Sequence, residues 1–204
     1  MTGLYLSQFS NYLAAAPGAD RVVEEIRDQL ACDYEHWRDH WKPVKDALFR
    51  DRKGSRDGQE LADIVAGAAA RRQASYTQAA ERWAQLTPLW DGLEYKRLST
   101  QSVQVGDLTV KVPQLPAELR PDGTLEVLVV RFNQSALPLH VIYGALRIVQ
   151  RAHPEATITF VDVPRLATYS SQDRDLTRFD EWLTQAGNDL AQLLGDGQDE
   201  AHAA

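Results

Sequence analysis

The chain has 204 residues, of which 44% are hydrophobic and 25% charged, as is ordinary for a water-soluble globular protein. Its 22 Lys and Arg residues against 29 Asp and Glu residues give a net charge of −7, so the surface as a whole does not favour nucleic-acid phosphates, although a local basic patch is still allowed. Cys32 is the single cysteine, which excludes an intramolecular disulfide and a multi-cysteine zinc site.

The N-terminus lacks both a basic segment and a continuous apolar segment of the kind found in secretory signals. No apolar run approaches the roughly 18 residues that a membrane span requires. We therefore expect a cytoplasmic protein with no membrane contact, in which Cys32 is a small buried side chain.

Apolar side chains at helical spacing predict that the first 90 residues form a helical region. Pro17-Gly18 ends the first helix, Asp20 caps the second, and Pro43 begins the third after a short turn. The charged segment from Gly54 to Gly58 is expected to be a loop. The expected helices span residues 4–16, 21–31, 43–52, 57–70 and 71–86.

His36 and His40 lie four residues apart, the spacing that binds zinc on one face of a helix. However, Trp37 occupies the position of the glutamate in helical zinc proteases, and the sequence offers no third ligand. We therefore interpret the two histidines as surface or capping residues and predict no metal site.

Residues 91–195 change to the two-residue periodicity of β-strands and then return to helix. A hairpin is expected over 95–112 with its turn at Gly106-Asp107, and strand, helix and strand are expected over 123–132, 137–151 and 157–163 with a right-handed crossover. A loop, a last helix over 176–193 and a disordered tail over 196–204 follow. The fold class predicted is α+β, with one small mixed sheet and a C-terminal helix.

The densest positive charge lies in the segment from residue 50 to residue 72, which could follow a phosphate backbone. Acidic side chains are interleaved with it, so the more ordinary interpretation is a solvated helix surface whose charges pair with one another. The candidate nucleic-acid-binding residues are Arg50, Arg52, Lys53, Arg56, Arg71 and Arg72.

The sequence contains neither a Gly-rich phosphate loop nor a G-x-S-x-G motif, so no catalytic residue and no cofactor is predicted. Asp162 follows a crossover near the carboxyl end of a strand, where open α/β sheets bind ligands. Glu126 and Lys111 are expected on neighbouring strands and could meet on one face.

The order of parts, a helical region beginning LSQFSNYL and then hairpin, strand, helix and strand, resembles the RecB-like branch of the PD-(D/E)XK nuclease superfamily. In that family the third core strand carries an acid, one further residue and a lysine, and carboxylates hold a divalent metal ion. Here Arg131 stands at the acid position and Asn133 at the lysine position, while Tyr143 in the next helix matches and Glu118 is the other available acid. Because a cation cannot ligate Mg²⁺, the resemblance implies a scaffold whose metal site is lost.

The segment HWKPVKDAL and the hairpin at Gly106-Asp107 also resemble bacterial proteins of unknown function, which favours a bacterial origin. Three hypotheses follow. The first is a non-catalytic accessory or protein-interaction module, with a protein partner or self-association through the Trp-rich helices and the C-terminal helix. The second is a nucleic-acid-binding protein without cleavage. The third is a metal-dependent nuclease or other hydrolase built from Asp107, Lys111, Glu118 and Glu126.

Overall fold

The computed structural model describes residues 3–15, 18–31 and 40–202, so Cys32, His36 and Trp37 lie outside the described residues. The helices before the sheets match the expected periodicity to within a few residues. They are α1 (Leu6–Ala15), α2 (Asp20–Ala31), α3 (Lys42–Lys53), α4 (Gln59–Ala66), α5 (Ala70–Leu86) and the short 3-10 helix η2 (Thr87–Trp90). Pro43 lies in the first turn of α3, where its missing N–H has no helical partner to lose.

The later elements alternate strands with two long helices. The strands are β1 (Leu4–Tyr5), β2 (Glu94–Arg97), β3 (Gln101–Val105), β4 (Leu108–Val112), β5 (Pro116–Leu119), β6 (Leu125–Arg131), β7 (Ala156–Asp162) and β8 (Ala167–Ser170). The helices are α6 (Leu139–Ala152) and α7 (Asp180–His202), with short 3-10 helices η3 (Val163–Arg165) and η4 (Thr177–Phe179). The predicted α+β class with a C-terminal helix is confirmed.

The strands form two sheets instead of the single sheet that the sequence predicts. The five-stranded sheet has the order β2-β5-β6-β7-β8, and within it only β6 and β7, which α6 connects, are parallel. The expected hairpin exists as β3 and β4, but it belongs to a separate three-stranded sheet of order β1-β4-β3. The run from Tyr95 to Val105, expected to be one strand, is split because β2 pairs with β5 and β3 pairs with β4.

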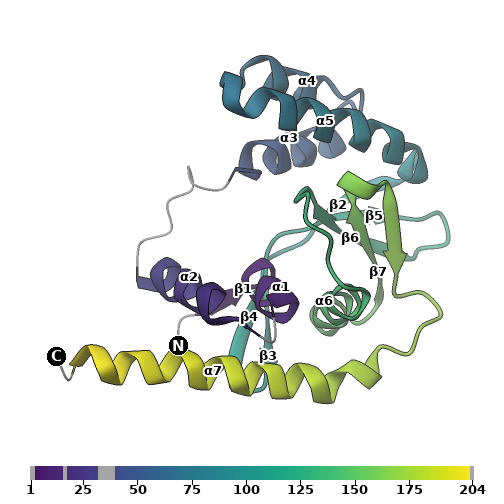
Figure 1. The fold of residues 1–204 in the computed structure, drawn as a ribbon. Helices are drawn as coiled ribbons and strands as arrows, with labels where there is room; N and C mark the ends of the chain where they lie inside the picture. Colours follow the sequence, from purple (N-terminus) through teal and green to yellow (C-terminus); the bar gives the residue numbers. More distant parts are fainter. Residues whose placement is uncertain (1–2, 16–17, 32–39, 203–204) are drawn as a thin grey trace.

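The five-stranded sheet has a different set of helices on each face (Figure 1). Helix α6 packs on one face, in a core that also includes α1, α2, α7 and the three-stranded sheet. Helices α3, α4 and α5 cover the other face, where Leu128, Phe132 and Val161 of the sheet meet Trp83 and Trp90. The N-terminal helical region therefore divides between the two cores.

Helix α7 lies along the three-stranded sheet and passes beside α2 (Figure 1). Gly187 permits a close approach, because a Cβ at this position would collide with the backbone of Val105 in β3. Asn188, the next residue of α7, accepts a hydrogen bond from the backbone N–H of Asp107 (2.9 Å). This contact fixes the tip of the β3-β4 hairpin against the helix.

Three further expectations from the sequence are corrected. Residues 164–175, expected to be a loop, contain β8, and residues 116–119, expected to lead into a turn, form β5. The tail expected to be disordered over 196–204 is helical as far as His202, as the end of α7. Among the described residues, no helix is long and apolar enough to cross a membrane.

Candidate functional site

Two glutamates lie side by side in the middle of the five-stranded sheet. Glu118 of β5 and Glu126 of β6 are direct cross-strand partners, which places both carboxylates on one face. That face also carries Leu128 and is covered by α3. Glu118 is 0% exposed and Glu126 is 4% exposed. A pair of buried carboxylates is the arrangement in this fold that comes nearest to a metal or acid-base site.

Glu118 is neutralised by two arginines of the helical layer. Arg52 of α3, itself 1% exposed, donates from Nε to Oε1 of Glu118 (2.8 Å) and from Nη2 to the carbonyl oxygen of Trp90 (3.0 Å). Arg56, just after α3, reaches Oε2 of the same carboxylate (3.2 Å). Both oxygens of Glu118 are thus engaged, and the pair joins α3 to the centre of the sheet.

Both carboxylate oxygens of Glu126 are also engaged, by one arginine and one hydroxyl. The hydroxyl of Thr159 in β7 donates to Oε1 (2.6 Å), and Arg120, in the turn between β5 and β6, pairs with Oε2. Glu126 and Thr159 are both 4% exposed, whereas the side chain of Arg120 reaches the surface. A metal ion at this pair would have to displace three arginines, because a cation cannot share these oxygens with guanidinium groups at no cost.

The other members of the proposed hydrolase cluster lie elsewhere. Asp107 is at the tip of the β3-β4 hairpin beside α7, and Lys111 is in β4, near the ring of Tyr5 (5.7 Å to the ring centre). The expectation that Lys111 and Glu126 lie on neighbouring strands is wrong, because β4 and β6 belong to different sheets. In the part of the chain that the structure describes, no three His, Cys, Asp or Glu side chains form a group that could hold a metal ion.

The predicted basic segment is dispersed over α3, the loop after it, and α5. Arg52 is buried and paired, so it has no surface to present to a phosphate. Arg50 pairs with Glu60 (2.7 Å), Arg56 pairs with Glu118, and Arg72 donates to the hydroxyl of Tyr76 (3.3 Å). Lys53 and Arg71 remain exposed. The interpretation of this segment as a largely self-paired helix surface fits these contacts better than a continuous phosphate track.

A second group of charged residues lies at the carboxyl end of the parallel pair. Arg131 is the last residue of β6, and its register partner is Asp162, the last residue of β7. Asp162 is 1% exposed, and both of its carboxylate oxygens accept hydrogen bonds from Arg165 of η3 (3.0 and 3.1 Å). Burial lowers the pKa of Arg131, the nearby Asp162 opposes this, and Arg165 adds to the lowering.

Arg131 is held by its own loop rather than by a carboxylate. It donates to the carbonyl oxygen of Asn133 (2.8 Å) and to the hydroxyl of Ser135 (3.3 Å). Asp162 therefore lies where its sequence position predicts, at a strand end, but as the partner of Arg165. At the two positions that the sequence resemblance singled out, Arg131 therefore binds the backbone oxygen of Asn133.

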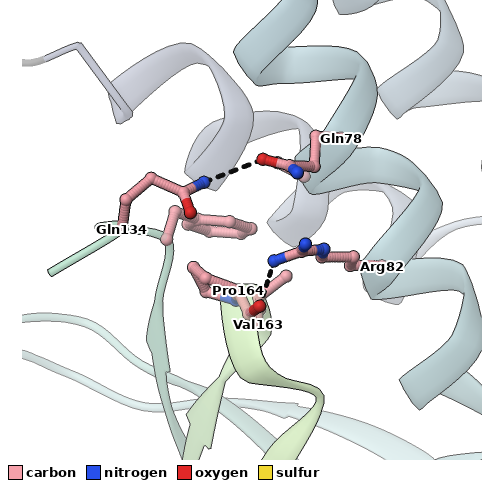
Figure 2. Close-up of a pocket in the computed structure, with 7 residues that line it drawn as sticks. Gln78, Arg82, Gln134, Val163 and Pro164 are labelled. Atoms are coloured by element: carbon pink, nitrogen blue, oxygen red, sulfur yellow. Dashed lines mark hydrogen bonds between the residues drawn. The ribbon is translucent and has the colours of Figure 1, made fainter. Parts of the chain in front are cut away.

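Beside this group, a shallow hollow lies between α5 and the loops after β6 and β7 (Figure 2). The amide of Gln134 donates to that of Gln78 across it (2.9 Å), and Arg82 of α5 donates to the carbonyl oxygen of Pro164. Phe132 and Val163 form the apolar floor. The side chains fill the hollow so closely that it does not enclose a small molecule.

Several residues singled out in the sequence have structural contacts. His40 shares a hydrogen bond with the hydroxyl of Ser75 (3.0 Å) and packs on Trp41 and Tyr76, while His36, its expected partner, lies outside the described residues. Trp83 and Trp90 are stacked on each other and buried, so they form core rather than an interaction surface. Tyr143 of α6 packs on Phe179 and lies under Arg174.

Sequence reasoning missed the exposed leucines at the strand-end edge. Leu139, in the first turn of α6, is 55% exposed, and Leu166, just after η3, is 43% exposed. Leu166 also has a left-handed backbone (φ 50°), which a branched side chain rarely adopts. Only the position of Leu139 after Pro138 could have indicated an exposed helix start.

Comparison with known proteins supplies no family. No protein-family model matches the chain, and no curated protein matches it. Among solved structures, the chain is similar to a protein known from the crystal structure of SSO0001, with 14% identity, a TM-score of 0.37 and 84% of each chain covered. A likeness at this level carries no argument about function.

Proposed function

We propose that this protein is a non-catalytic interaction module, built on a scaffold that resembles PD-(D/E)XK nucleases. The observation that carries the proposal is the state of the two central carboxylates. Glu118 and Glu126 are adjacent and buried, yet their oxygens are bonded to Arg52, Arg56, Arg120 and Thr159. Glu118 connects the helical layer to the sheet, and Glu126 connects β6 to β7 and to the β5-β6 turn.

The surface proposed for a protein partner is the strand-end edge, defined by Leu139 and Leu166. Both leucines expose a large apolar side chain at the end of the β6-α6-β7 unit, and Leu166 does so from a strained backbone. Backbone strain of this kind persists where the surrounding structure holds it, and it is often found at binding sites. The buried tryptophans Trp83 and Trp90 make the helical layer a weaker candidate.

Site-specific photocross-linking in the host tests this surface directly. A photoreactive phenylalanine analogue replaces Leu139, Leu166 or, as a control of similar exposure in η2, Leu89, which is 57% exposed. We expect one discrete protein adduct from positions 139 and 166 and none from position 89. A second copy of this chain in the adduct would identify self-association, and absence of any adduct, or equal adducts at all three positions, would refute the surface.

Nucleic-acid binding through the segment from Arg50 to Arg72 is the second candidate. It is favoured only by the exposure of Lys53 and Arg71, because Arg50, Arg52 and Arg56 pair with carboxylates and Arg72 is partly buried against Tyr76. A metal-dependent hydrolase is the least supported of the three. Asp107 and Lys111 belong to the β3-β4 hairpin of the three-stranded sheet, whereas the two glutamates belong to the five-stranded sheet.

A further inference from the structure

Three arginines from three elements meet around the loops that follow β6 and β7. Arg165 donates to Asp162 and to the carbonyl oxygen of Gln134, and Arg131 donates to the carbonyl oxygen of the preceding residue, Asn133. Arg82 donates to the carbonyl oxygen of Pro164, the residue before Arg165. One continuous set of backbone contacts therefore holds all three guanidinium groups at the same edge of the sheet (Figure 2 shows the Arg82 side).

The charge at this edge is not balanced by the contacts that hold it. Within the described part of the chain, Asp162 is the one carboxylate among the hydrogen-bond partners of these three arginines, and Arg165 occupies both of its oxygens. The remaining contacts are backbone carbonyl oxygens and one serine hydroxyl, which carry no net charge. Three positive groups against one negative group leave an excess of two positive charges, on a chain whose overall charge is −7.

The chemistry at the edge matches an oxyanion with several oxygens. A guanidinium presents a planar set of five N–H donors, and negatively charged phosphate oxygens accept strong, charge-assisted hydrogen bonds from it. Each of the three arginines uses only part of its donor set on the loops. The amides of Gln78 and Gln134 line the adjoining hollow and add neutral donors that can contact a sugar or a phosphate.

The shape of the edge favours a polymer over a small molecule. The hollow does not enclose a ligand, so a mononucleotide would gain no buried base or ribose. The arginines come from α5, β6 and η3, and each is held by a separate contact. Because the three guanidinium groups are held independently, they suit contacts to separate phosphates better than joint binding of a single phosphate. A nucleic-acid backbone presents phosphates in this way.

We propose that Arg82, Arg131 and Arg165 form a binding site for the phosphodiester backbone of a nucleic acid at the carboxyl end of β6 and β7. This site is separate from the segment of residues 50–72. Leu166 directly follows Arg165, so a nucleic acid bound here would compete with a protein partner at the same edge. The two proposals are tested by separate measurements, cross-linking at the leucines and oligonucleotide binding by the arginines.

Fluorescence anisotropy with a labelled oligonucleotide, single- or double-stranded, tests the site on the full chain between about 50 and about 200 mM salt. We expect salt-sensitive binding, and Arg131→Gln and Arg82→Gln each to lower the affinity about tenfold and to reduce the salt dependence by about one phosphate contact. Arg165 is left unchanged, because its removal would leave Asp162 buried and unpaired. Circular dichroism verifies folding of each variant, and either variant alone is sufficient for the test.

Lys53→Gln and Arg71→Gln are the matched controls, because they remove an exposed positive charge from the alternative segment. We expect both to bind as the unsubstituted chain does. Loss of affinity in these controls but not in Arg131→Gln and Arg82→Gln would overturn the proposal. So would absence of binding at the lowest salt, or binding of a phosphoserine peptide of equal charge in preference to the oligonucleotide.

Discussion

At the residue scale, the central feature is the ion pair between Arg52 and Glu118, which has side-chain exposures of 1% and 0%. Removing one partner of a buried pair leaves an uncompensated charge, so we expect Glu118→Ala to lower the free energy of unfolding by about 3 to 5 kcal/mol. Urea denaturation followed by circular dichroism measures this change. A loss below about 1 kcal/mol would show that the carboxylate is not a structural partner of Arg52.

The double variant Arg52→Met with Glu118→Leu is the control for that prediction. It removes both charges and restores apolar packing, so we expect it to recover most of the stability that Glu118→Ala loses. Arg56, which is 21% exposed, can then turn toward solvent. Failure of the double variant to recover would mean that the position requires the carboxylate for some other purpose.

A second residue-scale prediction concerns the pair between Arg147 of α6 and Asp180 at the start of α7. Two hydrogen bonds (2.8 and 2.7 Å) join them, and those bonds, followed by the charge of Arg147, hold the pKa of Asp180 below its ordinary value of 3.8 despite some opposing burial. A lowered carboxyl pKa stabilises the fold above the ordinary pKa, and this contribution is lost as pH falls through the lowered pKa.

We therefore expect Asp180→Asn to destabilise the protein near neutral pH by about 0.5 to 1 kcal/mol, a modest value because the side chain is 39% exposed. The difference should shrink as the pH falls below about 4. Denaturation midpoints of both proteins across this range measure it. A difference that stayed constant down to the lowest pH would contradict the assigned role of Arg147.

Local residue patterns predicted some of these residue-scale features and missed others. The strand-end position of Asp162 and the alternation that aligns Glu126 with Leu128 follow from the sequence. The pairing of Glu118 with Arg52 does not, because it links residues 66 positions apart through the packing of a helix on a sheet. Because this pairing is not visible in the sequence, the sequence places Arg52 among the exposed basic residues of the segment from residue 50 to residue 72, although Arg52 is buried.

At the element scale, the seating of α7 on the hairpin depends on Gly187. A methyl group there would collide with the backbone of Val105, which cannot rotate away as a side chain can. We expect Gly187→Ala to destabilise the protein by about 2 to 3 kcal/mol through overpacking. Thermal or urea unfolding measures the change.

Gly195, on the same helix, is the matched control. It is exposed, and no atom lies within 4 Å of the position that its Cβ would take. Gly195→Ala should therefore leave stability unchanged or raise it by up to about 1 kcal/mol, because alanine favours helix more than glycine does. Equal effects of the two substitutions would contradict the close contact between α7 and β3.

The elements with strong periodicity were the ones that the sequence predicted well. The unit formed by β6, α6 and β7 was predicted from its apolar runs and turn residues, as were α1 to α5 in outline. Strands β5 and β8 were missed, since each has only four residues and the first begins with a proline. Strand β1 has two residues and depends entirely on its pairing with β4.

At the scale of the whole molecule, the five-stranded sheet separates two cores. Chain order does not reveal this, because α1 and α2 contribute to one core and α3 to α5 to the other. The same separation explains why the sequence suggested one sheet: the segment from Glu94 to Val112 is continuous in pattern, but its strands pair with different partners. The division into two sheets depends on which strands pair in the folded protein, and the local strand propensity of the sequence does not specify that pairing.

This arrangement places the two glutamates beneath the helical layer and the three arginines at an open edge. Glu118 connects α3 to the sheet, Glu126 connects neighbouring strands, and the strand ends carry three arginines and two exposed leucines.

The most direct test of the central claim is an assay for cleavage of labelled single- and double-stranded DNA and RNA in Mg²⁺ or Mn²⁺, analysed on denaturing gels. We predict that every substrate remains intact at all metal concentrations, because the oxygens of Glu118 and Glu126 are bonded to arginines and Thr159. Metal-dependent cleavage that disappears in folded Glu118→Gln and Glu126→Gln variants would contradict the account and show that these glutamates are catalytic.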